Sequence, residues 1–141
     1  MIIIHYPEPD FQIKNNNQQQ QIFDKIRKKW VVLTPEEWVR QNFIAYLIQV
    51  KKYPATLFSV EKEIKQTDFQ NRYDLVVYKQ EKPWLLVECK EPGTLLSAAT
   101  VQQIVGYNQQ VNANYLVLVN GNDCFAWDIK KEEAINDLPD W

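Results

Sequence analysis

Three charged residues have the types and the spacing to do chemistry together: Asp74, Glu88 and Lys90. Side chains alternate along a strand, so Glu88 and Lys90 should project to one side of theirs, roughly 6.6 Å apart at about 3.3 Å per residue. A polar turn at 79–82 indicates an antiparallel hairpin. Because the start of its first strand faces the end of its second, Asp74 should lie close to Glu88. We expect two carboxylates and an ammonium group to meet at one corner of a sheet.

Two carboxylates a few ångströms apart repel each other, so the pKa of one of them rises unless a cation joins them. Mg²⁺ or Mn²⁺ suits such a pair, because a hard cation takes one or two carboxylates, several waters and phosphate oxygens. Lys90 could orient or deprotonate a water on the metal and stabilise charge on a phosphorane-like transition state. The three residues predict metal-dependent phosphodiester hydrolysis. The simpler alternative is an exposed Glu88–Lys90 ion pair without chemistry.

A predicted helix over about 97–111 adds two polar side chains that could reach this corner. Gln103 and Tyr107 are spaced i, i+4 and therefore share a face. We expect that face to differ from the apolar stripe of the helix, which consists of Ala98, Val101, Val105 and Val111. The alternative is a half-exposed helix surface without function.

A second predicted helix, over about 34–52, begins with strong capping signals. Thr34 is the expected N-cap, Pro35 suits the first helical position, and Glu37 completes a capping box. Glu36 lies nearer the inward side and could join the charged corner. A solvated Glu36 that is stabilised by the helix dipole is the alternative.

The order of the predicted elements is α-β-β-β-α-β over about 34–129, followed by one more strand. Helices packed on a mixed central sheet give an α/β fold of the α+β kind in a single domain, 1–141. Within the strand that ends at Lys90, we expect Trp84 and Leu86 to share the face of Glu88. Residues 1–30 should add an N-terminal β-hairpin, and 130–141 a loosely attached tail.

Composition and charge exclude several classes of function. One histidine and two cysteines are too few for a structural zinc site, and no apolar run is long enough to cross a membrane. With no secretory leader, we expect a soluble, cytoplasmic chain. The net charge is −2, yet the first 80 residues carry an excess of positive charge. Basic residues concentrate at Lys25, Arg27, Lys28 and Lys29, which predicts a weak nucleic-acid contact or simply a solvated basic stretch.

Four segments in this order resemble the N-terminal nuclease domain of type I restriction enzyme R subunits, a branch of the PD-(D/E)xK nuclease superfamily. They are TPEEWVRQ at 34–41, Tyr73-Asp74, VECK at 87–90 and QIVGY at 103–107. The resemblance covers about residues 22–129 and implies a restriction-endonuclease-like core. Tyr73 departs from the proline of the family motif. Because 141 residues leave no room for a helicase-like motor, we expect a stand-alone relative.

The resemblance also implies roles for individual residues. Asp74 and Glu88 correspond to the metal-binding acids, Lys90 to the catalytic lysine, and Gln103 with Tyr107 to the QxxxY pair. Glu36 corresponds to a first-helix acid that often joins the site, and the Cys89 backbone carbonyl to a further metal ligand.

The leading hypothesis is therefore a Mg²⁺-dependent endodeoxyribonuclease. DNA is the expected partner, other restriction or DNA-processing subunits are further candidates, and a homodimer is left open. Two alternatives compete with it: a binding module for DNA or protein that keeps the fold without catalysis, and a purely structural domain.

Overall fold

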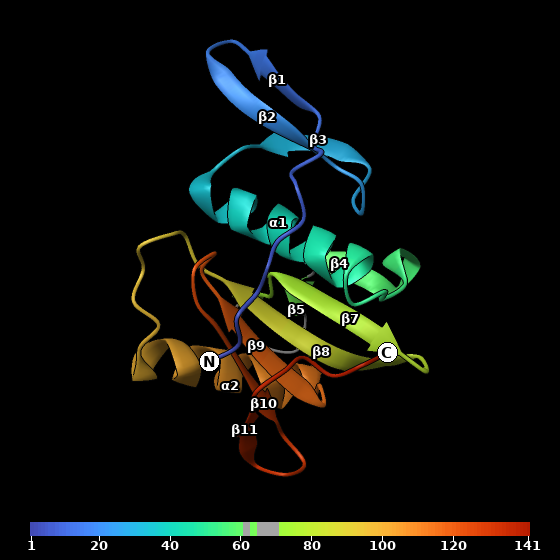
Figure 1. Ribbon diagram of the computed structural model, residues 1–141, viewed down its shortest axis with the longest axis vertical. Coiled ribbons are helices and arrows are strands. Elements are labelled where there is room, and N and C mark those ends of the chain that lie inside the picture. The colour runs from blue at the N-terminus through green and yellow to red at the C-terminus, as the bar shows by residue number, and fades with distance from the viewer. Residues whose placement is uncertain (61–62, 65–70) are drawn as a thin grey trace.

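The computed structural model describes residues 1–60, 63–64 and 71–141 (Figure 1). Its centre is a six-stranded sheet in the order β11-β10-β9-β8-β7-β4. The strands are β4 (Phe58–Val60), β7 (Leu75–Lys79), β8 (Lys82–Cys89), β9 (Tyr115–Val119), β10 (Cys124–Asp128) and β11 (Glu133–Ile135). The β8–β9 pair is parallel and the other pairs are antiparallel, so the predicted α/β class with a mixed sheet is confirmed. Alternating apolar residues in the sequence predict a strand over 57–64, and residues 61–62 of it lie outside the described residues.

Two helices cover opposite faces of this sheet (Figure 1). Helix α1 (Pro35–Gln49) buries Phe43 and Leu47 against one face, with β7, β8 and β9 beneath them. Helix α2 (Ala98–Val111) connects the parallel strands β8 and β9 and packs Ile104 on the other face. The αβββαβ order predicted from the sequence is therefore present, and the apolar residues 75–77 of β7 and 84–87 of β8 are buried.

A second sheet lies beyond α1, away from the central sheet (Figure 1). Its strands are β1 (Ile13–Asn16), β2 (Gln19–Asp24) and β3 (Lys29–Val32), all antiparallel. The predicted N-terminal hairpin is β1–β2, and its tip is Asn17-Gln18, where both residues have positive φ. A short helix, η1 (Ala55–Leu57), and a small hairpin of β5 (Glu63–Ile64) and β6 (Asn71–Arg72) complete the described elements.

The apolar stripe predicted for α2 is wrong in phase. Val105 is 44% exposed, whereas Ile104 and the polar Asn108 are buried against the sheet. Asn108 tolerates burial because its Oδ1 accepts a hydrogen bond from Ala113 N at 2.7 Å, just past the end of the helix. A prediction from apolar residues alone could not include a buried asparagine. The predicted stripe therefore fell on the neighbouring side of the helix.

The face predicted for Trp84 is also wrong. Trp84 packs with Leu85 in the cluster beneath α1, whereas Leu86 packs on the α2 side. The cause is a β-bulge: the register of the β7–β8 ladder shifts between Val77 and Tyr78, so strict alternation fails at Trp84.

The C-terminal residues are not a loose tail. They form β11, which pairs with β10, and then run back across the sheet towards β8 (Figure 1). Leu138 is 2% exposed, and Trp141 contacts the rings of Tyr53 and Trp84. In the part of the chain that the structure describes, no helix is long and apolar enough to span a lipid bilayer.

Candidate active site at the open end of the central hairpin

The bulge in β8 determines which residues meet at the open end of the hairpin. On the turn side Tyr78 pairs with Pro83, but beyond the bulge Leu75 pairs with Val87. Continued by one residue, this register sets Asp74 opposite Glu88 on the α2 face. Without the extra residue Asp74 would oppose Val87, and Glu88 would point to the other face.

Asp74 is anchored by the backbone of β8. Its Oδ2 accepts a hydrogen bond from Cys89 N at 2.6 Å, and its side chain is only 13% exposed. Glu88 is 7% exposed and its Oε1 lies 3.2 Å from Lys90 Nζ. The structure therefore brings the three residues together, as predicted from their spacing.

Helix α2 supplies the next two predicted residues. Lys90 Nζ donates a hydrogen bond to Gln103 Oε1 at 3.0 Å, and Gln103 Nε2 donates to the Tyr107 hydroxyl at 3.0 Å. Ile104, which lies between Gln103 and Tyr107 in sequence, packs on the sheet and so fixes the rotation of α2. This rotation places both polar side chains beside β8. Glu88, Lys90, Gln103 and Tyr107 thus form one continuous chain of polar contacts.

The two carboxyl groups perturb each other strongly. Burial, and after it the charge of Glu88, raises the pKa of Asp74 to about 7. Burial also raises the pKa of Glu88, although the Lys90 ammonium opposes that change. The raised pKa of Asp74 is the shift expected when two acids share a buried site, because one negative charge disfavours the other.

Arg40 of α1 reaches the same corner and was missed by the sequence reasoning. Its side chain is 3% exposed, and its NH2 atom lies 3.8 Å from Asp74 Oδ1 and 3.7 Å from Glu36 Oε1. Glu36 itself is 46% exposed, and its charge contributes to the raised pKa of Glu88. The sequence did contain a signal for Arg40: it is a charged residue next to Val39, on the inward face of the helix.

A buried network links this corner to the N-terminal sheet. Arg27 lies between Asp24 and Glu37, with Nε–Oδ2 and NH2–Oε1 distances of 2.6 and 2.7 Å. Glu37 also lies 3.4 Å from Arg40 Nε and accepts a hydrogen bond from Gln41. The Thr34 cap is confirmed by a 3.0 Å bond from Glu37 N, but the Glu37 carboxylate belongs to this network and not to a capping box.

The four basic residues singled out in the sequence therefore divide into two groups. Arg27 is 13% exposed and engaged with two carboxylates, whereas Lys25, Lys28 and Lys29 are exposed. A phosphate contact in this region would fall to the three lysines.

The donor set at the corner suits a hard cation. Among residues 1–60 and 73–141, no group of three or more His, Cys, Asp or Glu side chains has the geometry of a metal site. Two carboxylates with a backbone carbonyl, waters and a phosphate are nevertheless a common shell for Mg²⁺. Burial keeps the pKa of the Cys89 thiol well above its usual value, so this residue can offer only its carbonyl. Asp74, Glu88 and the Cys89 carbonyl would be the ligands.

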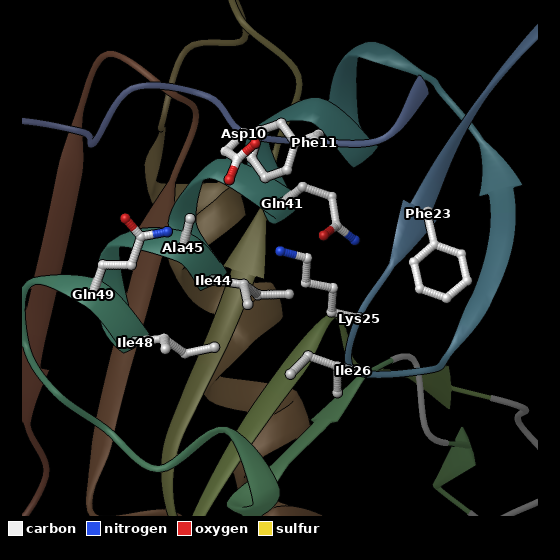
Figure 2. Close-up of a pocket in the computed structure, with 10 residues that line it drawn as sticks. All are labelled: Asp10, Phe11, Phe23, Lys25, Ile26, Gln41, Ile44, Ala45, Ile48 and Gln49. Carbon is white, nitrogen blue, oxygen red and sulfur yellow. The ribbon is translucent and has the colours of Figure 1, made fainter. Parts of the chain in front are cut away.

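Two of the hollows lie where the N-terminal sheet meets α1. A groove of about 580 Å³ extends from β3 over the start of α1 to Glu36 and Arg40. A smaller pocket of about 140 Å³ lies further along α1, and the Lys25 amine points into it between Gln41 and Ile44 (Figure 2). Of these two, the groove is the one that reaches the residues bordering the carboxylate corner.

A family model described as type I restriction enzyme R protein N terminus matches residues 35–140, which is most of the chain. No curated protein matches the sequence.

Proposed function

The chain belongs to the type I restriction enzyme R protein N-terminal family, and we propose that it is a Mg²⁺-dependent endonuclease that hydrolyses phosphodiester bonds in DNA. The observation that carries the proposal is the convergence of Asp74, Glu88 and Lys90 at one end of the hairpin. A divalent cation held there would supply positive charge to the scissile phosphate and lower the pKa of the attacking water.

The residues of the chain have distinct tasks in this proposal. Asp74 and Glu88, with the Cys89 carbonyl, hold the cation. The Lys90 ammonium, fixed by Gln103 and Glu88, faces the phosphate and stabilises the negative charge that develops on its oxygens. Water oxygen bonds to phosphorus, one phosphorus–oxygen ester bond breaks, and the protons of the water pass to the leaving oxygen and to solvent.

The remaining residues position these groups. Tyr107 orients Gln103, and Gln103 orients Lys90, so both act through the lysine. Arg40 and Glu36 border the corner and set its charge. Lys25, Lys28 and Lys29 are exposed on the N-terminal side and would contact the DNA backbone, where such contacts are independent of sequence.

Nicking of supercoiled plasmid tests the proposal. We expect Mg²⁺ or Mn²⁺ to support nicking, EDTA to stop it, and Lys90→Ala or Asp74→Asn to reduce the rate by about 100-fold or more. Lys82→Ala is the matched control, because Lys82 is an exposed lysine at the opposite end of β8, and its rate should equal that of the wild type. Equal rates for Lys90→Ala and the wild type would remove these residues from the mechanism.

One observation favours a second candidate, a binding module that keeps the fold without catalysis. Asp74 already has the Cys89 N–H and the Arg40 guanidinium as partners, so the corner is satisfied without a metal. A module of this kind would bind DNA or protein and would show no metal-dependent nicking. Metal binding, measured as a rise in the melting temperature with Mn²⁺, separates the two candidates.

A further inference from the structure

One face of the N-terminal sheet carries the side-chain types that hold unpaired bases. The register sets Phe23 opposite Trp30 and Lys14 opposite Gln21, so these side chains share a face. Ring and cation contacts agree: Phe23 meets Trp30 edge-on at 5.5 Å, and Lys14 Nζ lies 4.3 Å from the centre of a Trp30 ring. We call this surface the Trp30 face; it comprises Lys14, Asn16, Gln19, Gln21, Phe23, Trp30 and Val32.

The opposite face of the same sheet is the one that packs on the protein. Ile22 and Asp24 are fully buried there, and Asp24 Oδ2 accepts a hydrogen bond from Gln41 of α1. The Trp30 face therefore points away from α1 over most of its length, with Lys14, Asn16 and Gln19 exposed and Val32 42% exposed. Phe23 and Trp30 are half-buried, and Phe23 also lines the pocket beside α1. An outward sheet face that combines an indole with an amine and several amides is well suited to a ligand that stacks on the ring and bonds to the polar groups.

A groove leads from this face towards the carboxylate corner. The groove of about 580 Å³ is lined by Gln21, Trp30 and Val32 at one end and by Glu36 and Arg40 at the other. Arg40 in turn contacts Asp74. A strand that lies along the groove with its bases on Trp30 would therefore approach the two α1 residues that border the corner.

We propose that the Trp30 face binds unpaired bases of a single DNA strand next to the phosphate that is cut, so that the substrate is single-stranded or locally opened DNA. This inference rests on the proposed nuclease function. An aromatic platform accepts any base, because every base has a π face, and neighbouring cations hold the backbone. Lys14, which lies over the indole, would move to the adjacent phosphate. In a duplex the bases are stacked on one another and cannot reach Trp30.

Fluorescence anisotropy in EDTA tests the face without cleavage. The probes are a labelled 12-nucleotide single strand, an abasic strand of the same length, and a hairpin duplex. We expect Trp30→Ala to weaken binding of the base-bearing strand by roughly 5- to 150-fold, with the abasic strand and the duplex unaffected. Trp30→Phe should restore most of the affinity. Trp127→Ala is the matched control, since Trp127 is a half-buried strand tryptophan outside this groove, and it should bind as the wild type does.

A measurement on the wild type covers the case in which Trp30→Ala does not fold: the base-bearing strand should bind at least about 5-fold more tightly than the abasic strand. Equal affinity for the two strands, or an equal loss with both on Trp30→Ala, would overturn the inference. The two proposals fail separately. If nicking requires Lys90 but single-strand binding does not depend on Trp30, only the proposed role of the Trp30 face is refuted. If binding depends on Trp30 but no nicking occurs, only the nuclease proposal is refuted.

Discussion

Burial and the charge of Glu88 make Asp74 a weak acid, and this couples the proton on one residue to the stability of the whole chain. The pKa of Asp74 is about 7 in the folded protein and about 3.9 when unfolded. Between these values the folded state holds more protons than the unfolded state, so the free energy of unfolding falls as pH rises. In EDTA, we expect the melting temperature to decline from about pH 4 to pH 7.

Asp74→Asn is the control for this prediction, because an amide keeps the shape and can still accept the hydrogen bond from Cys89 N. It should flatten the decline in calorimetric or fluorescence melting curves. A wild-type profile that rises from pH 4 to 7, or that matches the Asn variant, would contradict a raised pKa.

The proton that Asp74 holds below its raised pKa also affects metal binding. A cation needs both carboxylates ionised, so its binding displaces this proton. We therefore expect Mn²⁺ to raise the melting temperature, more at pH 8 than at pH 6, and to have no such effect on Asp74→Asn. No shift at either pH would favour the binding module without catalysis.

At this scale, spacing along the chain carried most of the information about the site. Glu88 and Lys90 are neighbours in sequence, Gln103 and Tyr107 are one helical turn apart, and local geometry brings each pair to one side. Arg40 was not predictable in the same way, because Asp74, the partner that brings it to the corner, is distant in sequence and outside α1. Arg27 shows the converse: a residue that belongs to a basic run in sequence is buried between two acids in space.

At the scale of elements, α1 holds the N-terminal sheet and the carboxylate corner in one arrangement through Arg40. Its guanidinium contacts the buried Glu37 and Asp74, and removing it leaves both without their shared cation. We expect Arg40→Met to lower the free energy of unfolding by about 3 kcal/mol in urea titrations. Glu36→Gln removes an exposed partner of the same arginine and should cost less than about 1 kcal/mol. Equal costs for the two changes would mean that Arg40 does not join the two parts.

An element was predictable where a single local rule, such as helix capping, determines it. It was not predictable where strand alternation competes with the pairing of two strands. Thr34 and Pro35 start α1 as their capping chemistry requires. Strand alternation identified β8 but missed its bulge, because a bulge arises from the pairing with β7 and leaves no mark in the alternation of a single strand. The same bulge that displaces Trp84 is what sets Asp74 opposite Glu88, so the irregular residue is part of how the site is built.

At the scale of the whole molecule, the two ends of the chain close the domain. Ile2 N donates a hydrogen bond to Cys124 O, which adds the N-terminal residues beside β10. At the other end the Tyr53 hydroxyl donates to Pro139 O, and Lys51 Nζ donates to Leu138 O at 3.0 Å. The C-terminal segment is acidic and contains Pro139, and for that reason composition alone predicted a loose tail.

If the C-terminal residues belong to the core, shortening Leu138 must weaken the entire domain. Leu138 is 2% exposed and packs in the cluster beneath α1, so Leu138→Ala removes buried methyl groups and leaves a cavity. We expect a loss of about 2–5 kcal/mol in the free energy of unfolding, with one cooperative urea transition at a lower midpoint. Asp140→Asn changes a side chain that is 99% exposed two residues away and should change the free energy of unfolding by no more than about 0.5 kcal/mol. An unchanged midpoint for Leu138→Ala would show that this segment is loosely attached, as its sequence suggests.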